Sequence, residues 1–391
     1  MKSNYRGIVK VLLGVVLMAI SLVSFSAVEP VAKVGGWQKA GYVNCAGNTK
    51  WVGRCPIGYE YVPQGLIFSE NFDAQPDWYS PASGDTGNGF FSALPSGWDA
   101  GRTSESWHPD NGYPNTQPVM QINGNNPDQV YGGTGKAFIF YGESYDENNW
   151  NSDGFLIKDI EPTKEVYVKL KIKFQTGFAD DTGRGQIKIF RMLSWDAPES
   201  GDRTPFFSDG YSSPIYIWDW AQTDYGLRNQ HAFRCDAQED NYYCQDPLIL
   251  NPPRSITSGS MSANYTDTPA YLNPQIPDLV NGGFLPSSGN VFHNQVYGDV
   301  WHTVEIYLKQ NSALGVQDGE MRYWLDGQPI IDMGGIPWIG PTGSMDAKWN
   351  SFSIGGNNFY KFDLVGDPVD RERWYAIDNI EVYNTLPEHL Q

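Results

Sequence analysis

The chain has 391 residues, of which 14% are aromatic and only 18% are charged, and it contains 42 Gly and 26 Pro. This length allows one large hydrophobic core or two modest ones, and the many turn residues, without long Leu/Ala/Glu/Lys runs, predict an all-β protein. The net charge of −18 argues against nucleic acid and anionic membranes as partners, because a negative field repels both.

The N-terminus has the pattern of an export signal. Lys2, Arg6 and Lys10 precede an apolar run at 11–23 and small residues at 24–27. We expect 1–27 to be a cleaved secretory signal peptide. A retained anchor helix is the alternative, but the apolar run is short for a bilayer crossing, which takes about 20 residues. The mature chain is therefore predicted to be secreted, extracellular or periplasmic, without a membrane span.

The cysteine spacing fits an oxidising compartment. Cys45 lies close to Cys55 in sequence, and Cys235 lies close to Cys244, which predicts two local disulfides. A zinc site built from the four thiolates is the alternative, but C-x2-C spacing is missing. The first pair falls in 28–65, which we expect to form a small N-terminal extension.

Alternating apolar residues predict strands along the rest of the chain. The segment at 165–174 places Val166, Val168, Leu170, Ile172 and Phe174 inward, with Tyr167 and three lysines outward. In the hairpin predicted at 301–327, Val304, Ile306 and Leu308 share a packed face, and Glu305, Tyr307 and Lys309 face water. The other expected strands lie at 66–73, 136–141, 186–191, 215–220 and 374–383. We expect one domain over 66–386, with long loops at 74–126 and 251–290 that wall a cleft.

Three segments carry a family resemblance. The hairpin reads W-H-x-V-E followed by D-G-x-x-x-x-W-x-D-G, the first strand reads E-N-F-D at 70–73, and the last reads A-I-D-N-I at 376–380. These resemble the concanavalin A-like, laminin-G-like jelly rolls. The resemblance implies a β-jelly-roll sandwich of two antiparallel sheets, with a polysaccharide as partner and a role as lectin, hydrolase or lyase.

Strand parity predicts which residues line the open sheet face. With Ile187 and Ile189 inward, Gln186 and Lys188 face out. With Ile215 and Ile217 inward, the face carries a strip of three aromatic rings, Tyr216, Trp218 and Trp220. Flat rings stack on sugar rings, so the strip predicts a carbohydrate platform. A second small core beneath a covering loop is the alternative.

The middle of the chain has a narrower resemblance. A strand, F-x-x-G-F at 174–178 and G-x-x-K at 185–188 are similar to polysaccharide lyases of the alginate and glucuronan lyase type. The resemblance places Lys188 at the family's lysine and Tyr216 at its tyrosine. The family's G-G-K-L-P-G motif is replaced by the residues at 183–188. The arginine role and the remaining substrate contacts fall to Arg191, Arg228, Arg234, Gln186, Trp218 and Trp220.

Elimination on a uronate needs a cation, a base and an acid. Lys188 or Arg234 would neutralise the sugar carboxylate, Tyr216 or His231 would remove the proton on the adjacent carbon, and Tyr225 would protonate the leaving oxygen. These residues make a lyase the leading hypothesis.

Two other functions stay open. A glycoside hydrolase needs two flanking carboxylates, for which Asp219 and Glu305 are the candidates. A non-catalytic carbohydrate-binding or cell-surface protein on the same fold needs only the aromatic strip.

No cofactor is required for any of these functions. Jelly rolls that resemble this one often hold a structural calcium, for which Asp180, Asp181 and the turn at 123–128 offer oxygen ligands. The same residues are also ordinary turn formers.

Overall fold

The computed structural model divides the chain into two compact units, Met1–Pro63 and Gln64–Gln391. It describes residues 37–39, 59–61, 64–82, 84–85, 89–103, 117–143, 151–176, 186–196, 203, 214–223, 226–234, 260–262, 299–359 and 372–391. The predicted signal peptide, the four cysteines and most of the loop at 251–290 lie outside these residues. Within the described part, no helix is long and apolar enough to cross a membrane.

Apart from short 3-10 turns, the described elements are strands. In the first unit, β1 (Trp37–Lys39) pairs antiparallel with β2 (Tyr59–Tyr61). The second unit contains β3 (Leu66–Glu70), β4 (Trp78–Tyr79), β5 (Phe90–Phe91), β6 (Ala100–Arg102), β7 (Met120–Asn123), η3 (Pro127–Gln129), η4 (Tyr131–Gly133), β8 (Ala137–Glu143), β9 (Asn151–Thr163), β10 (Glu165–Phe174), β11 (Gln186–Leu193), β12 (Ile215–Thr223), β13 (Gly226–Arg234), β14 (Ser260–Ser262), β15 (His302–Lys309), β16 (Gly319–Leu325), β17 (Gln328–Ile336), β18 (Trp349–Phe359), β19 (Glu372–Tyr383) and η8 (Glu388–Leu390).

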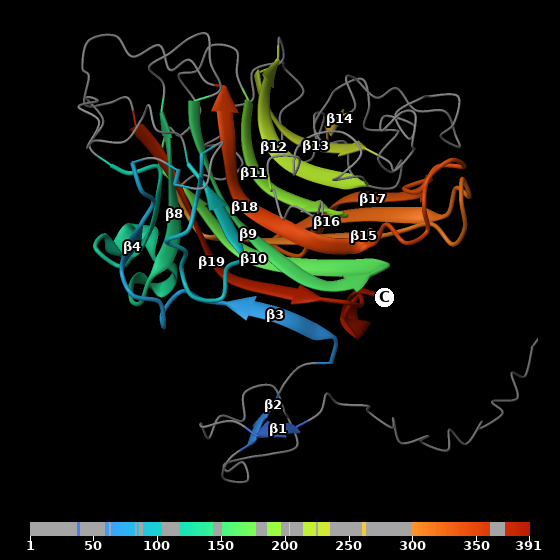
Figure 1. Ribbon diagram of the computed structural model, residues 1–391, viewed down its shortest axis with the longest axis horizontal. Coiled ribbons are helices and arrows are strands. Elements are labelled where there is room, and N and C mark those ends of the chain that lie inside the picture. The colour runs from blue at the N-terminus through green and yellow to red at the C-terminus, as the bar shows by residue number, and fades with distance from the viewer. Residues whose placement is uncertain are drawn as a thin grey trace, which may run out of the picture. The chain divides into compact units, whose positions relative to one another are not determined.

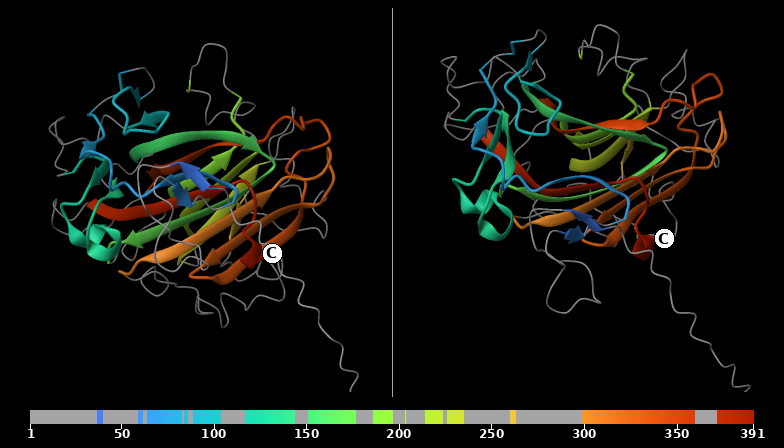
Figure 2. Two further views of the ribbon diagram at one scale, coloured as in Figure 1. Left: turned by 90° about the horizontal axis from the view of Figure 1, so that it is seen from below. Right: turned by 60° about the horizontal axis from the view of Figure 1, so that its bottom comes forward.

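The second unit is a sandwich of two antiparallel sheets (Figures 1 and 2). One has nine strands, in the order β17-β16-β15-β10-β19-β8-β7-β4, with β3 paired to β19. The other has eight, in the order β14-β13-β12-β11-β18-β9-β6-β5. Neighbouring strands within a sheet are often distant in sequence, which is the connectivity of a β-jelly roll. The predicted fold class is confirmed.

A single large core fills the space between the sheets. The inward set predicted for β10 is confirmed, since its five residues from Val166 to Phe174 are all buried there. The first and last strands of this unit pair with each other, with Phe68 opposite Val382. Both chain ends of this unit therefore meet in the middle of the nine-stranded sheet.

The predicted hairpin is present as β15 and β16, with Leu308 opposite Met321. Val304, Ile306 and Leu308 belong to the core, as predicted. The Asp-Gly pair that follows turns β16 into β17, and both residues have positive φ, 52° at Asp326 and 75° at Gly327. Asp and Gly adopt this backbone more readily than other residues, so the turn closes a second hairpin.

The outer face of the nine-stranded sheet is not the water-facing surface that the alternation predicts. Tyr307 is buried, Glu305 is only 7% exposed, and Tyr167 is buried beside them. The Tyr167 hydroxyl donates to Glu305, and the Tyr307 hydroxyl donates to Glu165 at 2.6 Å. Burial of a polar group costs little free energy when the group is hydrogen-bonded. The tyrosine–glutamate hydrogen bonds therefore allow these side chains to be buried on the outer face.

A bend in β19 buries a carboxyl group. Asn379 has φ of 48°, and the register with β10 shifts beside it. Asp378 accepts the backbone N–H groups of Asn379 at 2.7 Å and of Tyr131 at 3.3 Å. Burial is the main cause that raises its pKa to about 7; the two hydrogen bonds act in the opposite direction, and the charges of Asp73 and Glu70 add to the rise.

This raised pKa predicts a pH dependence of stability. Between pH 4 and 7 the folded chain keeps a proton on Asp378 that the unfolded chain releases, so the free energy of unfolding falls as pH rises through this window. The loss should not exceed about 4 kcal/mol. Urea unfolding at pH 4 and pH 8 measures it, and Asp378→Asn should flatten the difference. An equal pH dependence in both proteins would contradict the assignment.

Candidate functional site

The eight-stranded sheet has a second apolar layer on the face turned away from the core, which we call the distal face. Eight buried residues form this layer: Phe90, Ala100, Phe155, Ile157, Leu193, Trp195, Ile215 and Ile217. They come from β5, β6, β9, β11 and β12 and from the residue two places after β11, and among these strands only β9 and β11 are separated, by β18. The distal face is therefore a packed surface that can position polar groups rigidly.

The predicted orientation of β12 is wrong. Tyr216 and Trp218 are both 0% exposed and belong to the core between the sheets, while Ile215 and Ile217 lie on the distal face. The Trp218 ring is 5.9 Å from that of Tyr323 on the opposite sheet. Both faces of this strand are apolar, so alternation defines two sets without telling which is inside. The side chain of Trp220 lies outside the described residues.

A β-bulge in β11 places two cations on the distal face. Lys188 is opposite Asp219 and Phe190 is opposite Trp218, so Ile189 is an extra residue. Ile189 and Phe190 are successive residues and both are buried in the core. Strict alternation would put Lys188 and Arg191 on opposite faces, because they are three apart. The extra residue brings both to the distal face.

Arg191 is the more deeply placed of the two cations, with 3% of its surface exposed. Its guanidinium lies 5.6 Å from the centre of the Phe155 ring, and its strand neighbours are Ile217 and Ser353. Lys188 is only partly buried. A guanidinium in such apolar surroundings acts more strongly on an anion than it would in water.

Glycines in β18 make room for the bulge. Gly355 has φ of +82°, and a Cβ there would lie 2.4 Å from the Gly154 carbonyl oxygen. A Cβ on Gly356 would lie 2.5 Å from the Lys188 carbonyl oxygen and 2.6 Å from the Lys188 Cβ. A side chain at Gly356 would push β18 away from the bulge in β11, and one at Gly355 would push it away from β9, so both glycines are needed for the close packing of β18 between these strands.

The chain that leaves β11 is fastened to the same face. The Trp195 N–H donates to Asn350 Oδ1 at 2.7 Å, and Asn350 Nδ2 donates to the Trp195 carbonyl at 2.9 Å. Further along, Arg203 forms a bidentate ion pair with Asp159, which also accepts the Ser351 hydroxyl at 2.9 Å. The sequence gives no local signal for these contacts, because the partners are 44 to 192 residues apart.

The other predicted site residues fall on neighbouring strands. Gln186 on β11 and Arg228 on β13 both pair with Ala221 of β12. Arg234 is in register with Ile215, a distal-face residue, and His231 is in register with Trp218, which faces the core. These side chains, and all of Tyr225, lie outside the described residues. The backbone positions nevertheless share one three-stranded patch.

The carboxylate pair considered for hydrolysis is wrong. Asp219 belongs to the eight-stranded sheet and Glu305 to the nine-stranded sheet. Glu305 lies on the outer face of its sheet, where it accepts the Tyr167 hydroxyl. The two residues therefore belong to different faces and cannot flank one glycosidic bond.

The turn at 123–128 uses its oxygens within the chain. Asn123 Oδ1 accepts the Asn125 N–H, and Asn126 Oδ1 accepts the Asp128 N–H, both at 3.0 Å. Among the described residues, no three His, Cys, Asp or Glu side chains are grouped to hold a metal. Asp180 and Asp181 lie outside them, and calcium stays a prediction.

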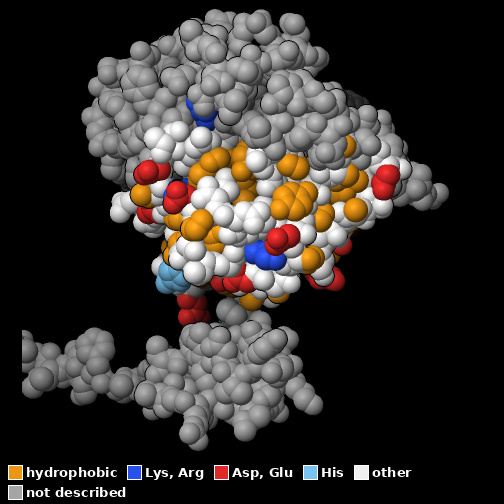
Figure 3. Space-filling view, turned by 90° about the vertical axis from the view of Figure 1, so that its left-hand side faces the viewer, with side chains coloured by type: hydrophobic (Ala, Val, Ile, Leu, Met, Phe, Trp, Pro, Cys, Tyr) orange, Lys and Arg blue, Asp and Glu red, His pale blue; other side chains and the backbone are white. Residues whose placement is uncertain are grey.

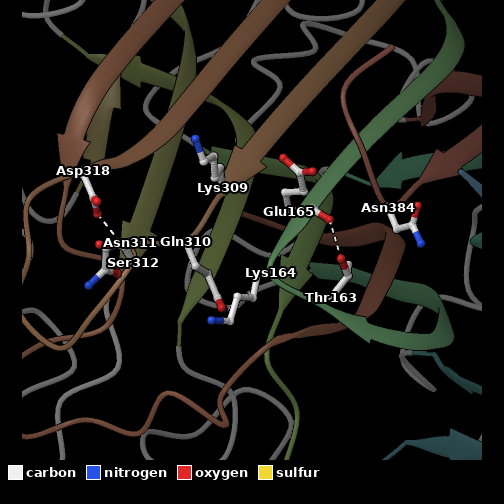
Figure 4. A pocket seen from close by; sticks show the side chains of 9 residues that line it. All are labelled: Thr163, Lys164, Glu165, Lys309, Gln310, Asn311, Ser312, Asp318 and Asn384. Atoms are coloured by element: carbon white, nitrogen blue, oxygen red, sulfur yellow. Dashed lines mark hydrogen bonds between the residues drawn. The ribbon is translucent and has the colours of Figure 1, made fainter. Parts of the chain in front are cut away.

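A pocket of about 500 Å³ lies at the other sheet, where the β9–β10 turn meets the end of β15 (Figure 4). Its lining consists of Thr163, Lys164, Glu165, Lys309, Gln310, Asn311, Ser312, Asp318 and Asn384. Several of its polar groups are engaged in the turns, as the dashed lines from Thr163 to Glu165 and from Ser312 to Asp318 show. None of the predicted site residues lines it.

No family model and no curated protein matches this chain. Among solved structures, an alginate lyase in complex with an alginate trisaccharide is 16% identical, over 82% of this chain and 99% of that one, with a TM-score of 0.40. An endo-β-1,4-glucuronan lyase from the fungus Trichoderma reesei is 10% identical over 82% and 96%, with a TM-score of 0.38. An endo-1,3-β-glucanase from Streptomyces sioyaensis is 13% identical over 82% and 97%, with a TM-score of 0.41.

Replacing Trp218 by Ala distinguishes a core residue from a surface platform. We expect a loss of about 3–5 kcal/mol in the free energy of unfolding, because the change leaves a cavity between the sheets. Leu314→Ala, at an exposed position, should change it by less than about 0.5 kcal/mol. Denaturant unfolding measures both, and equal small effects would contradict the core placement.

Replacing Gly356 by Ala tests the contact with the bulge. The added methyl group meets backbone atoms of Lys188, so we expect a loss of about 1–3 kcal/mol. Gly334 in β17 is the matched control, because a Cβ there meets nothing within 4 Å. Thermal or urea unfolding compares the two variants. A Gly356→Ala protein as stable as Gly334→Ala would show that the bulge does not need the glycine.

Proposed function

We propose that this chain is a secreted polysaccharide lyase that cleaves a uronic-acid polymer by β-elimination at the distal face of the eight-stranded sheet. The observation that carries the proposal is the placement of Lys188 and Arg191 together on that face by the bulge in β11. In a chain with net charge −18, two adjacent cations form a local site for carboxylates.

The role of the cations follows from the chemistry of elimination. The carboxylate of the uronate withdraws little charge while it is itself negative. When Lys188 and Arg191 neutralise it, the proton on the adjacent ring carbon becomes acidic. A base takes that proton, and the electron pair of the broken carbon–hydrogen bond forms a carbon–carbon double bond. The bond from the next ring carbon to the glycosidic oxygen then breaks. The departing oxygen takes a proton from an acid, so the atoms balance without water or cofactor.

The two cations have different tasks in this proposal. Arg191 is rigid and buried, so it fixes the position of the carboxylate, and the more exposed Lys188 closes on it from the solvent side. Gln186 of the same strand and Arg228 and Arg234 of β13 are the further substrate contacts in this proposal. Tyr225 as acid remains a proposal from the sequence, whereas the register of His231 with the core-facing Trp218 argues against His231 as the base. Tyr216 has no part, because its side chain lies in the core.

Absorbance measurements on the mature protein test the activity. Incubation with alginate, glucuronan, pectate or glycosaminoglycans should raise the ultraviolet absorbance for one of them, because elimination creates a conjugated uronate. Lys188→Ala should lower the rate by at least about 100-fold, the effect of removing one group that stabilises developing charge. Lys164→Ala, which removes an exposed lysine far from the site, should leave it unchanged.

The outcomes separate the candidate functions. Full activity of a folded Lys188→Ala protein would overturn the site assignment. Retention on one of these glycans with a flat absorbance trace would show a binding protein in place of a lyase.

A further inference from the structure

A group of aromatic side chains lies on the outer face of the nine-stranded sheet, away from the proposed active site. Tyr141, Trp301 and Trp374 are partly buried and pack around a small apolar centre formed by Val130, Ala137, Ile139 and Ala376. Tyr131 stands at the edge, with its ring 5.7 Å from that of Trp301 in an edge-to-face contact. We call these four aromatic residues the aromatic patch.

The patch is open to solvent at one side. Tyr131 is 40% exposed and Val300 is 55% exposed, although both are large apolar residues. Figure 3 looks at the side that carries η3, η4 and β8, and shows hydrophobic side chains gathered on its described surface. The central alanines are small, so the rings can form a shallow platform. Exposed flat rings of this kind suit the apolar faces of sugars.

Two glutamines fasten members of the patch: Gln129 bonds the hydroxyl of Tyr141, and Gln175 bonds the backbone of Trp374. Gln129 Nε2 donates to the Tyr141 hydroxyl at 3.0 Å. Gln175 Oε1 accepts the backbone N–H of Trp374 at 3.1 Å, and the backbone N–H of Gln175 donates to the Trp374 carbonyl oxygen at 2.9 Å. A pre-organised platform loses less side-chain entropy when it binds a ligand.

Two lysines of β10 adjoin the patch. Lys171 Nζ lies 4.9 Å from the centre of the Tyr131 ring and donates to Thr303 Oγ1 at 2.6 Å. Lys173 is in register with Ala376 in the centre of the patch. Within the part of the chain that the structure describes, no carboxylate is ion-paired with either lysine. Both keep their positive charge available to a ligand.

Two described carboxyl groups in this part of the sheet have hydrogen-bond partners of their own. Asp326 lies 2.6 Å from His302 Nδ1 and also accepts the Thr303 N–H. Asp378, next to Lys171 in the sheet, is buried and accepts two backbone N–H groups. The patch therefore combines stacking surfaces with two lysines that have no ion-pair partner among the described residues, in a strongly acidic protein, which is complementary to an anionic sugar chain.

We propose that the aromatic patch is a second polysaccharide-binding surface, which holds a uronic-acid chain by ring stacking and by the ammonium groups of Lys171 and Lys173. Because it belongs to the other sheet, it is separate from Lys188 and Arg191 and binds polymer without taking part in cleavage. The choice of an acidic sugar as ligand rests on the proposed function, whereas the presence of a binding surface does not.

Affinity electrophoresis in gels that contain alginate, pectate or glucuronan tests the proposal. All proteins carry Lys188→Ala so that the gel is not digested, and the Tyr131→Ala/Lys171→Gln double variant is compared with the parent. We expect the parent to be retarded and the double variant to bind about tenfold more weakly, as the loss of one stacking contact and one charge implies. Leu314→Ala/Lys164→Gln, with the same residue types changed elsewhere, should match the parent.

Three other results would overturn the proposal that the aromatic patch binds a polysaccharide. Equal retardation of the double variant and the parent, or no retardation of the parent on any acidic glycan, would contradict the proposal of a second polysaccharide-binding surface. A dimer in size-exclusion chromatography that the double variant loses would show that a second copy of the chain covers the patch instead. Absorbance assays of the chain with intact Lys188 on short uronate oligosaccharides report the proposed lyase activity separately, because these oligosaccharides are too short to need the patch.

Discussion

The bulge at Ile189 is the constraint on which the proposed site depends. One extra residue in β11 allows two successive side chains, Ile189 and Phe190, to enter the core. The flanking cations Lys188 and Arg191 then share the opposite face. Gly356 in the next strand is its counterpart, because a residue without a side chain can approach the bulged backbone at Lys188 so closely.

The remaining structure supports this arrangement from both sides. The core between the sheets is continuous and rich in aromatic rings, so β11 and β12 are fixed on a rigid base. On the distal face a second apolar layer surrounds Arg191, and the hydrogen bonds of Asn350 and Asp159 fasten the chain beyond β11 to the sheet. A charge held in such surroundings is pre-organised for an anionic ligand and does not need to move when that ligand binds.

The sequence predicts strands well where apolar and polar residues alternate clearly. The strands at 165–174, 301–309 and 374–383 alternate clearly, and all three occur as β10, β15 and β19. It predicts orientation poorly where both faces of a strand are apolar, as in β12, because burial on both sides removes the contrast that alternation needs. The long loop expected at 74–126 contains the short strands β4 to β7, which are too brief to show a period.

The site itself could be predicted only in part. Lys188 stands out as a cation in an apolar run, but its relation to Arg191 depends on a bulge that no residue in β11 signals by itself. The contacts of Asp159, Arg203 and Asn350 join distant segments and have no sequence signature. The same holds for the aromatic patch, whose members come from η4, β8, β19 and the residue before β15.

The proton NMR spectrum of a uronic-acid polymer digested by the mature chain tests the central claim most directly. Elimination predicts one olefinic signal at a new non-reducing end for every new reducing end. New reducing ends without olefinic signals would mean hydrolysis and would contradict the roles given to Lys188 and Arg191. An unchanged spectrum for every acidic glycan would show that the chain does not cleave these polymers.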